Sequence, residues 1–193
     1  MRSSGERYPN DRLRTSVSGY WYKADRLITE AFDEDAFLGV SFVNQGQVRA
    51  KGVELEAQWR LKGEARTLVS YALQTAVDQQ TGAGLANSPR HIAKGRISLP
   101  VPGRDSFVSV EGQYLSSRTT VAGPPVSAAA TVSVHFVRPI GRSWELFGGV
   151  RNALDARYSD PVSEQHKQGA IEQNGRTARV GSAGSSGIPR SAG

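Results

Sequence analysis

The sequence contains no cysteine, which excludes disulfide frameworks, thiolate metal sites and cysteine nucleophiles. It also lacks any run of about 18 apolar residues, the length that a membrane-spanning helix needs. Residues 1–7 lack the apolar core of a secretion signal, and helical periodicity is almost absent along the chain. These absences exclude a disulfide-stabilised scaffold and a helical membrane protein.

The composition indicates a folded but weakly apolar chain. Of its 193 residues, 38% are apolar, which is low for a packed soluble domain, yet aromatic residues are too frequent for simple disorder. The length suits one domain or two small ones. The formal net charge is +6, but the basic residues are scattered and form no run of five. We therefore expect no nucleic-acid partner.

Alternation of apolar and polar residues is the dominant pattern, and it predicts strands. The alternation recurs over residues 65–75, 93–101, 108–114, 130–136 and 144–151. At residues 53–61 it divides the side chains into two faces, with Val53, Leu55, Ala57, Trp59 and Leu61 opposite Glu54, Glu56, Gln58 and Arg60.

Tight turns and long connections alternate between these strands. The tight turns contain Gly63, Gly103 and Gly141, which recur about every 40 residues and can adopt positive φ. The long polar connections are expected at residues 77–90, 118–127 and 156–175. Nearer the start, a strand around residues 12–23 leads into an acidic stretch at 24–39, and another strand begins near residue 40. A propeller blade needs four strands per period, so a period with two strands predicts a repeating hairpin.

Three features favour an all-β, antiparallel transmembrane β-barrel over a sandwich. The strands reach about ten residues, enough to cross a bilayer at a tilt. Short turns alternate with long loops, and aromatic residues lie near both strand ends, as in the girdles of such barrels. The aromatic residues near short turns are Trp59, Phe107 and Trp144, and those nearer the long loops are Tyr71, Tyr114 and Tyr158.

The charged residues that alternate with apolar ones along each strand determine which face of the sheet meets the lumen. A basic side chain facing lipid near the midplane costs roughly 2–4 kcal/mol. A shift of one residue would turn Lys94 and Arg96 toward lipid together. We therefore expect the polar rows to face a lumen that is wet or filled by another polar domain. About eight strands are expected; if they closed on themselves, the barrel would be small and its interior filled by side chains.

Four motifs resemble TonB-dependent outer-membrane receptors. Residues 150–158 (VRNALDARY) resemble the family's V-x-N-L-F/L-D-x-x-Y stretch, and residues 52–56 (GVELE) resemble its G-V/I-E-x-E strand. Residues 88–91 (SPRH) and 175–177 (GRT) resemble the family's x-P-x-H segment and the G-R that opens its final strand. Order and spacing resemble the C-terminal third of the family's barrel, over roughly residues 10–181. The motif residues are interpreted as structural: Gly52, Glu54, Glu56, Asn152, Asp155, Tyr158, Gly175 and Arg176.

The resemblance implies a barrel of about 22 strands with a plugged lumen, located in the cell outer membrane. Such receptors take up scarce ligands, usually ferric siderophores, when the TonB complex acts on the plug. The implied partners are outer-membrane lipid, a plug domain and the remaining barrel strands, with TonB acting only through the plug. No cofactor is implied, and the ligand is not identified by the sequence.

The sequence departs from the family pattern by lacking a plug, a signal peptide and most of the strands. We therefore expect a receptor fragment that does not transport alone. Its expected organisation is an irregular segment at residues 1–11, a partial barrel at 12–181, and a disordered or out-of-frame tail at 182–193.

No catalytic or metal-binding constellation is found in the sequence. His91, His135 and His166 lie far apart and follow no ligand spacing. No G-x-S-x-G motif occurs, and Asn152 and Asp155 suit a loop-opening role, so we expect no enzyme. Residues in the long loops are the expected ligand contacts, with Arg90, Arg118 and Lys167 as candidates.

Two alternatives stay open at this point. One is a small complete outer-membrane barrel of eight strands with a structural or adhesive role. The other is a soluble β-sandwich binding module, in which Val132, Val134 and Trp144 would be shielded inside a core.

Overall fold

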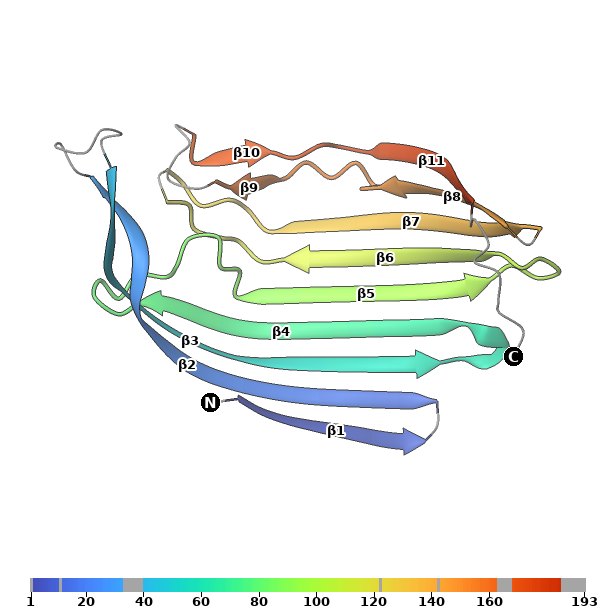
Figure 1. Cartoon of the computed structure of the whole chain (residues 1–193), viewed down its shortest axis with the longest axis horizontal. Helices are drawn as coiled ribbons and strands as arrows, with labels where there is room; N and C mark the ends of the chain where they lie inside the picture. Colours follow the sequence, from blue (N-terminus) through green and yellow to red (C-terminus); the bar gives the residue numbers. More distant parts are fainter. Residues whose placement is uncertain are drawn as a thin grey trace, which may run out of the picture.

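The computed structural model describes residues 2–10, 12–32, 40–121, 123–141, 143–162 and 168–184. Within these ranges nine strands form one antiparallel sheet, in which each strand lies beside the next along the chain (Figure 1). These strands are β1 (Arg2–Asn10), β2 (Leu13–Phe32), β3 (Val40–Arg60), β4 (Arg66–Asp78), β5 (His91–Pro100), β6 (Phe107–Leu115), β7 (Ala129–Ile140), β8 (Trp144–Arg151) and β11 (Thr177–Gly184). Two short strands, β9 (Ser159–Pro161) and β10 (Ala170–Glu172), pair as a separate hairpin before β11.

The sheet is a single open layer whose edges are β1 and β11 within the described part of the chain. The register is regular across its centre, where Val53 pairs with both Gly19 and Leu73, and Ile97 pairs with both Thr67 and Val110. The predicted all-β, antiparallel fold class is therefore confirmed, and the sheet does not close within the described residues. The sheet has nine strands where about eight were expected.

The short turns agree with the prediction. Gly63, Gly103 and Gly141 adopt φ of 67°, 70° and 62°, a region that side chains with a Cβ disfavour. The first of these turns contains the short 3-10 helix η1 (Lys62–Glu64). These turns all lie at one end of the sheet, and the long loops lie at the other end (Figure 1).

Three boundaries differ from expectation. Residues 2–10 form β1, not an irregular segment, because they pair with β2 although their own sequence does not alternate. Strand β2 continues through the expected acidic connection as far as Phe32, because it stays paired with β3. Residues 182–184, expected in a disordered tail, extend β11; the rest of that tail lies outside the described residues.

The extension of β11 has a packing reason. The ring of Phe147 lies over Gly181, where a Cβ would approach Phe147 Cζ to 2.7 Å. The ring of Trp144 lies against Gly184 in the same way, at 3.4 Å. Glycine therefore lets the aromatic residues of β8 cover the backbone of β11. Strand β8 therefore supplies the large aromatic side chains that the glycine- and serine-rich sequence of β11 lacks.

The described residues form almost no apolar core. Apart from Pro89 and Pro161, only four small or medium apolar residues are buried there, and they are Ala50, Ala65, Val126 and Ala129. Large apolar side chains are instead exposed, including Trp59 at 53% and Trp144 at 59%. A β-sandwich would bury such residues between two sheets. The sandwich alternative is therefore wrong for this structure, and the apolar face needs a partner other than these strands.

Candidate functional site

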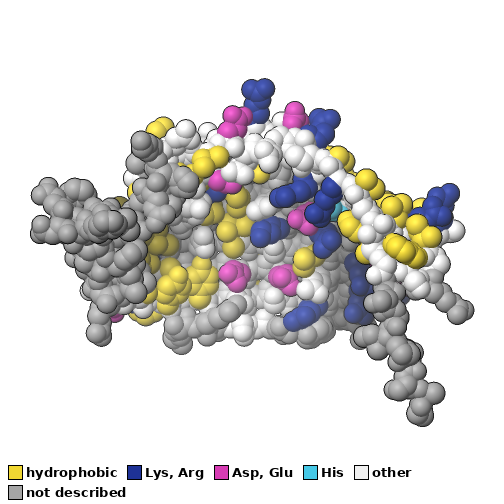
Figure 2. Space-filling model, turned by 45° about the horizontal axis from the view of Figure 1, so that its top comes forward, with side chains coloured by type: hydrophobic (Ala, Val, Ile, Leu, Met, Phe, Trp, Pro, Cys, Tyr) yellow, Lys and Arg dark blue, Asp and Glu magenta, His cyan; other side chains and the backbone are white. Residues whose placement is uncertain are grey.

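The two faces of the sheet differ in chemistry. Along β3, Val53, Leu55 and Trp59 are exposed on the outer face, whereas Glu54 and Arg60 belong to the inner face. The pairing extends these rows across the sheet, since Leu55 lies between Val17 and Tyr71. Figure 2 shows dark blue basic and magenta acidic side chains gathered together on one face of the molecule. The candidate functional surface is this inner face, together with the loops at one of its ends.

Gly52 lies beneath an aromatic ring on the inner face. The ring of Tyr20 covers it so closely that a Cβ at position 52 would lie 2.6 Å from Tyr20 Cζ. The Tyr20 hydroxyl donates to Gln74 Oε1 at 3.1 Å, and Gln74 Nε2 donates to the Pro89 carbonyl at 3.0 Å. A residue larger than glycine would displace the tyrosine, so Gly52 permits a polar chain that crosses β3 and joins β2 and β4 to a long loop.

Glu54 and Glu56 lie further along β3 and line a hollow of about 540 Å³ on the inner face. Ser18, Ser70 and Lys94 line the same hollow. Glu56 Oε1 accepts a hydrogen bond of 2.8 Å from Gln58 Nε2. Both carboxylates therefore face the interior of the curved sheet, and their role there stays a prediction.

The motif after β8 forms a closed turn. Asn152 is only 5% exposed; its Nδ2 donates to the Ala156 carbonyl at 2.8 Å, and its Oδ1 accepts from Ala156 N at 2.9 Å. Asn152 and Asp155 adopt φ of 49° and 56°, which asparagine and aspartate tolerate better than most residues. This geometry agrees with the loop-opening interpretation of the pair.

Asp155 also holds the start of β11. Its Oδ1 accepts a hydrogen bond of 2.7 Å from Arg176 N. A Cβ at Gly175 would lie 2.6 Å from the same oxygen, so a larger residue there would push the carboxylate away from Arg176 N. The two motifs, which are about 20 residues apart, therefore meet in one contact. Tyr158 lies nearby and its carbonyl accepts from Gln173 N at 2.9 Å.

Arg118 connects three long loops and is only 5% exposed. Its Nη1 donates to Asn87 Oδ1 at 3.0 Å, and its Nη2 donates to the Ser159 carbonyl at 3.0 Å and to Asp160 Oδ1 at 2.6 Å. Its Nε is buried and has no hydrogen-bond partner among the described residues. The guanidinium of Arg118 therefore holds loops together. The sequence had suggested instead that Arg118 contacts a ligand.

The other candidate loop residues are placed differently. Arg90 is exposed beside the buried Pro89, and Lys167 lies outside the described residues. Nothing in the sequence around Arg118 signalled its role, because its partners come from loops 31 to 42 residues away.

The histidines that the structure describes do not come together. His91 Nδ1 lies 2.7 Å from the Tyr71 hydroxyl, at the start of β5. His135 lies on the inner face of β7 and covers Gly149, where a Cβ would lie 2.8 Å from His135 Nδ1. His166 is outside the described residues. No group of three histidine, aspartate or glutamate side chains able to hold a metal occurs among the residues described.

A polar hollow of about 390 Å³ lies at the loop end of the inner face. Strands β6 to β8 and β11 supply its walls, and its residues are almost all polar or charged. Glu111, His135, Arg151, Tyr158 and Arg179 are among them. Such a lining suits a hydrated or polar occupant.

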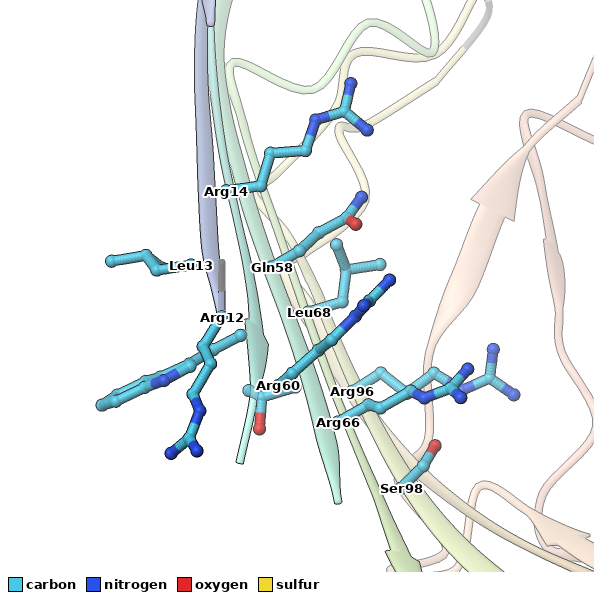
Figure 3. Close-up of a pocket in the computed structure, with 11 residues that line it drawn as sticks. Arg12, Leu13, Arg14, Gln58, Arg60, Arg66, Leu68, Arg96 and Ser98 are labelled. Atoms are coloured by element: carbon cyan, nitrogen blue, oxygen red, sulfur yellow. The ribbon is translucent and has the colours of Figure 1, made fainter. Parts of the chain in front are cut away.

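An arginine-rich groove of about 680 Å³ lies at the short-turn end of the sheet, and its lining includes Leu13 and Trp59 of the outer face as well as inner-face residues. Figure 3 shows the side chains of Arg60, Arg66 and Arg96 pointing to the same side of the sheet, while Leu13 points to the opposite side. Gln58, Leu68 and Ser98 complete its inner lining. The groove therefore carries a concentrated positive charge.

No helix among the described residues is long and apolar enough to span a membrane. An open antiparallel sheet with one apolar face and one charged face has the features of a wall section of a β-barrel. The chain is therefore, by fold, a section of barrel wall.

A family model described as "TonB dependent receptor-like, beta-barrel" matches residues 4–153. The chain therefore belongs to the TonB-dependent receptor family, as its motifs predicted. No curated protein matches the sequence significantly.

Solved structures show the same fold. The ferric citrate transporter FecA in the unliganded form is similar with a TM-score of 0.76 and 17% identity over 95% of this chain. The ferric yersiniabactin uptake receptor FyuA from Yersinia pestis has a TM-score of 0.74 with 14% identity over 94%, and the copper transporter OprC has 0.73 with 18% over 95%. The chain spans only 29–30% of the length of these three proteins.

Proposed function

We propose that this chain forms part of the membrane-spanning wall of an outer-membrane receptor that takes up a scarce ligand, such as a ferric siderophore, by TonB-dependent transport. The similar structures carry ligands of this kind in their names, namely ferric citrate, ferric yersiniabactin and copper. The family membership supports a receptor role in place of an enzymatic one.

The exposed apolar outer face is the observation that carries this proposal. Trp59, Leu99 and Trp144 are exposed on strands that have no second layer within the described residues. A monomeric protein in water seldom exposes an apolar surface of this extent. Lipid would cover this face, and Trp59 and Trp144 near the short turns suit the membrane interface. Phe107, expected in the same girdle, lies instead on the inner face, because it shares the face of Ser109 and His135.

The open edges indicate that the chain works with further strands. Backbone groups of β1 and β11 face outward along the sheet edges, and unpaired edges are unstable in lipid. The remaining barrel strands would pair with them, and a plug domain would fill the charged interior. The isolated chain is then unable to transport.

The motif residues are proposed to support the wall and its loops, not to contact the ligand. Gly52, Asn152, Asp155 and Gly175 each make or permit a contact within the chain. Ligand contacts are proposed for exposed loop residues such as Arg90, together with the plug.

The test compares one substitution on each face of β4 in the assembled receptor. Val69 is exposed on the outer face, and Ser70 lies on the inner face near the acidic hollow. Val69→Arg is expected to cost roughly 2–4 kcal/mol and to reduce the heat-modifiable band on gels, whereas Ser70→Arg is expected to assemble normally. Uptake of labelled ferric siderophores under iron limitation should follow the same order. Equal tolerance of both substitutions would contradict a lipid-facing wall.

A second measurement addresses the isolated chain. We expect it to show no heat-modifiable band after refolding into liposomes, because its edges are open. A defined band would support the small complete barrel instead of a section of a larger one.

A further inference from the structure

Three arginines converge on the inner face near the short turns. Arg60 of β3 lies directly opposite Arg66 of β4 in the register of the sheet. Arg96 of β5 follows on the next strand, where it lies opposite Leu68. All three side chains are exposed and line the same groove, with their guanidinium groups on one side of the sheet (Figure 3). We call these three residues the arginine triad.

The arginine triad forms no ion pair within the described residues, although one carboxylate lies beside it in the register. None of its members forms an ion pair or a side-chain hydrogen bond there. Glu111 is the register partner of Arg96 on β6, but the two form no ion pair. Glu56, the other carboxylate on this face nearby, accepts from Gln58 instead.

This arrangement disfavours the sheet by itself. Like charges directly opposite one another on neighbouring strands repel, and Arg60 and Arg66 form such a pair. Alternation explains why these positions are polar, but it does not require two arginines in one pair. An anionic occupant of the groove would remove the repulsion and use all three guanidinium groups.

We propose that the arginine triad docks an acidic segment of the plug domain against the barrel wall. This inference rests on the proposed function, which places a plug inside the barrel. Guanidinium groups bind carboxylates in a two-pronged geometry, so aspartate or glutamate side chains match the triad. The groove of about 680 Å³ is large enough for a peptide segment, and the exposed Leu68 offers it an apolar contact between the arginines.

The location of the triad separates this contact from ligand capture. The triad lies at the short-turn end, whereas the long loops and the polar hollow lie at the opposite end of the strands. An acidic plug segment held here would anchor the plug to the wall without occupying the loop end. Release of the plug would then require separation of these charges and would become easier as salt concentration rises.

The test uses zero-length carbodiimide cross-linking in the assembled receptor. Arginine does not react, but Arg66→Lys retains the charge and provides an amine that couples to an adjacent carboxylate. We expect mass spectrometry to find residue 66 joined to an aspartate or glutamate of the plug, and high salt to decrease that product. A photo-cross-linking residue at position 68 reports whatever occupies the groove, whether charged or not.

The outcomes distinguish the inference from the function on which it rests. A photo-cross-link to the plug without any carbodiimide product would overturn the acidic segment and leave the plugged receptor intact. Absence of both products would overturn the inference together with the plug. A carbodiimide reaction at residue 66 only with added free citrate, and none with the plug, would show a small-anion site and would also overturn the inference.

Discussion

The two ends of the sheet are held by different means. At the short-turn end, backbone geometry closes the β3–β4, β5–β6 and β7–β8 hairpins through a glycine with positive φ, as at Gly63 and Gly103. At the long-loop end, side chains connect the loops to one another, and Arg118 alone donates hydrogen bonds to two neighbouring loops. A turn needs only its own residues, whereas a long loop costs conformational entropy that distant partners must offset. The loop end is therefore the more sensitive to single substitutions.

The largest effect at the loop end is expected for Arg118→Ala. The change leaves Asp160 and Asn87 without their donors and should cost about 1.5–3 kcal/mol of local stability, the range for hydrogen bonds to charged groups. Hydrogen exchange in the assembled receptor should increase over residues 79–90 and 152–162. Arg90→Ala, at an exposed position in the neighbouring loop, is the control and should change exchange little. Equal effects of the two changes would contradict the role given to Arg118.

Gly52→Ala tests the contact between Gly52 and the ring of Tyr20, which supports the hydrogen bonds that reach the long loop before β5. Its new Cβ would enter the ring of Tyr20, break the bond to Gln74 and cost about 1–3 kcal/mol. Gly95→Ala is the matched control, since nothing lies within 4 Å of a Cβ there. A denaturant titration measures both, and adding Tyr20→Ala should recover most of the loss at position 52. No recovery would show that the ring is not the cause.

Asn152→Ala removes both hydrogen bonds to Ala156 and places alanine at positive φ. We expect a loss of about 1–2 kcal/mol, because two partly buried hydrogen bonds disappear together. Asn174→Ala, at an exposed position before Gly175, is the control. Protease cleavage within residues 152–162 provides the measurement, and unchanged cleavage would oppose a structural role.

Gly103→Ala probes the short-turn end. Its φ of 70° suits glycine, so alanine should cost about 1 kcal/mol and no more, because open space surrounds the position. The melting temperature of the assembled receptor should fall less than with Arg118→Ala. A larger fall would mean that the turns, not the loops, control the stability of the wall.

The smallest effect is expected when acid protonates the carboxylate of Asp78, the last residue of β4. Hydrogen bonds from Thr81 N, the Thr81 hydroxyl and Gln80 N lower the pKa of Asp78, with Thr81 N the leading cause. A lowered pKa means that the ionised carboxylate stabilises the turn above its ordinary pKa of 3.8 and that this support is lost as pH falls below it. The protection of the Gln80 and Thr81 amides, taken relative to the intrinsic exchange rate at each pH, should fall in acid, and Asp78→Asn should remove that dependence. If the pH dependence persists in Asp78→Asn, a titratable group other than Asp78 causes it.

Particular residues show how far the sequence alone was informative. The alternation at residues 53–61 and the turn glycines predicted the strands, their two faces and the hairpin repeat. The motif at residues 150–158 predicted a loop opening, and the hydrogen bonds of Asn152 agree with it. β1 and the end of β11 were not predicted, because their pairing depends on neighbours rather than on their own pattern.

The contacts at the loop end were beyond sequence reasoning for a similar reason. The partners of Arg118 lie 31 to 42 residues away, and no local pattern indicates which loops approach one another. The arginine triad likewise depends on register, since Arg66 and Arg96 lie on different strands.

By itself, the sequence determined that this chain forms long antiparallel strands with one apolar and one polar face, because period-two alternation dictates where each side chain points. It also determined the family, through short motifs with a consistent order. Only the tertiary structure decided which charges oppose one another, which loops Arg118 joins and why Gly52 lies under Tyr20. Those contacts arise where strands and loops distant in sequence come into register, and the free energy of such contacts depends on distances that no single segment specifies.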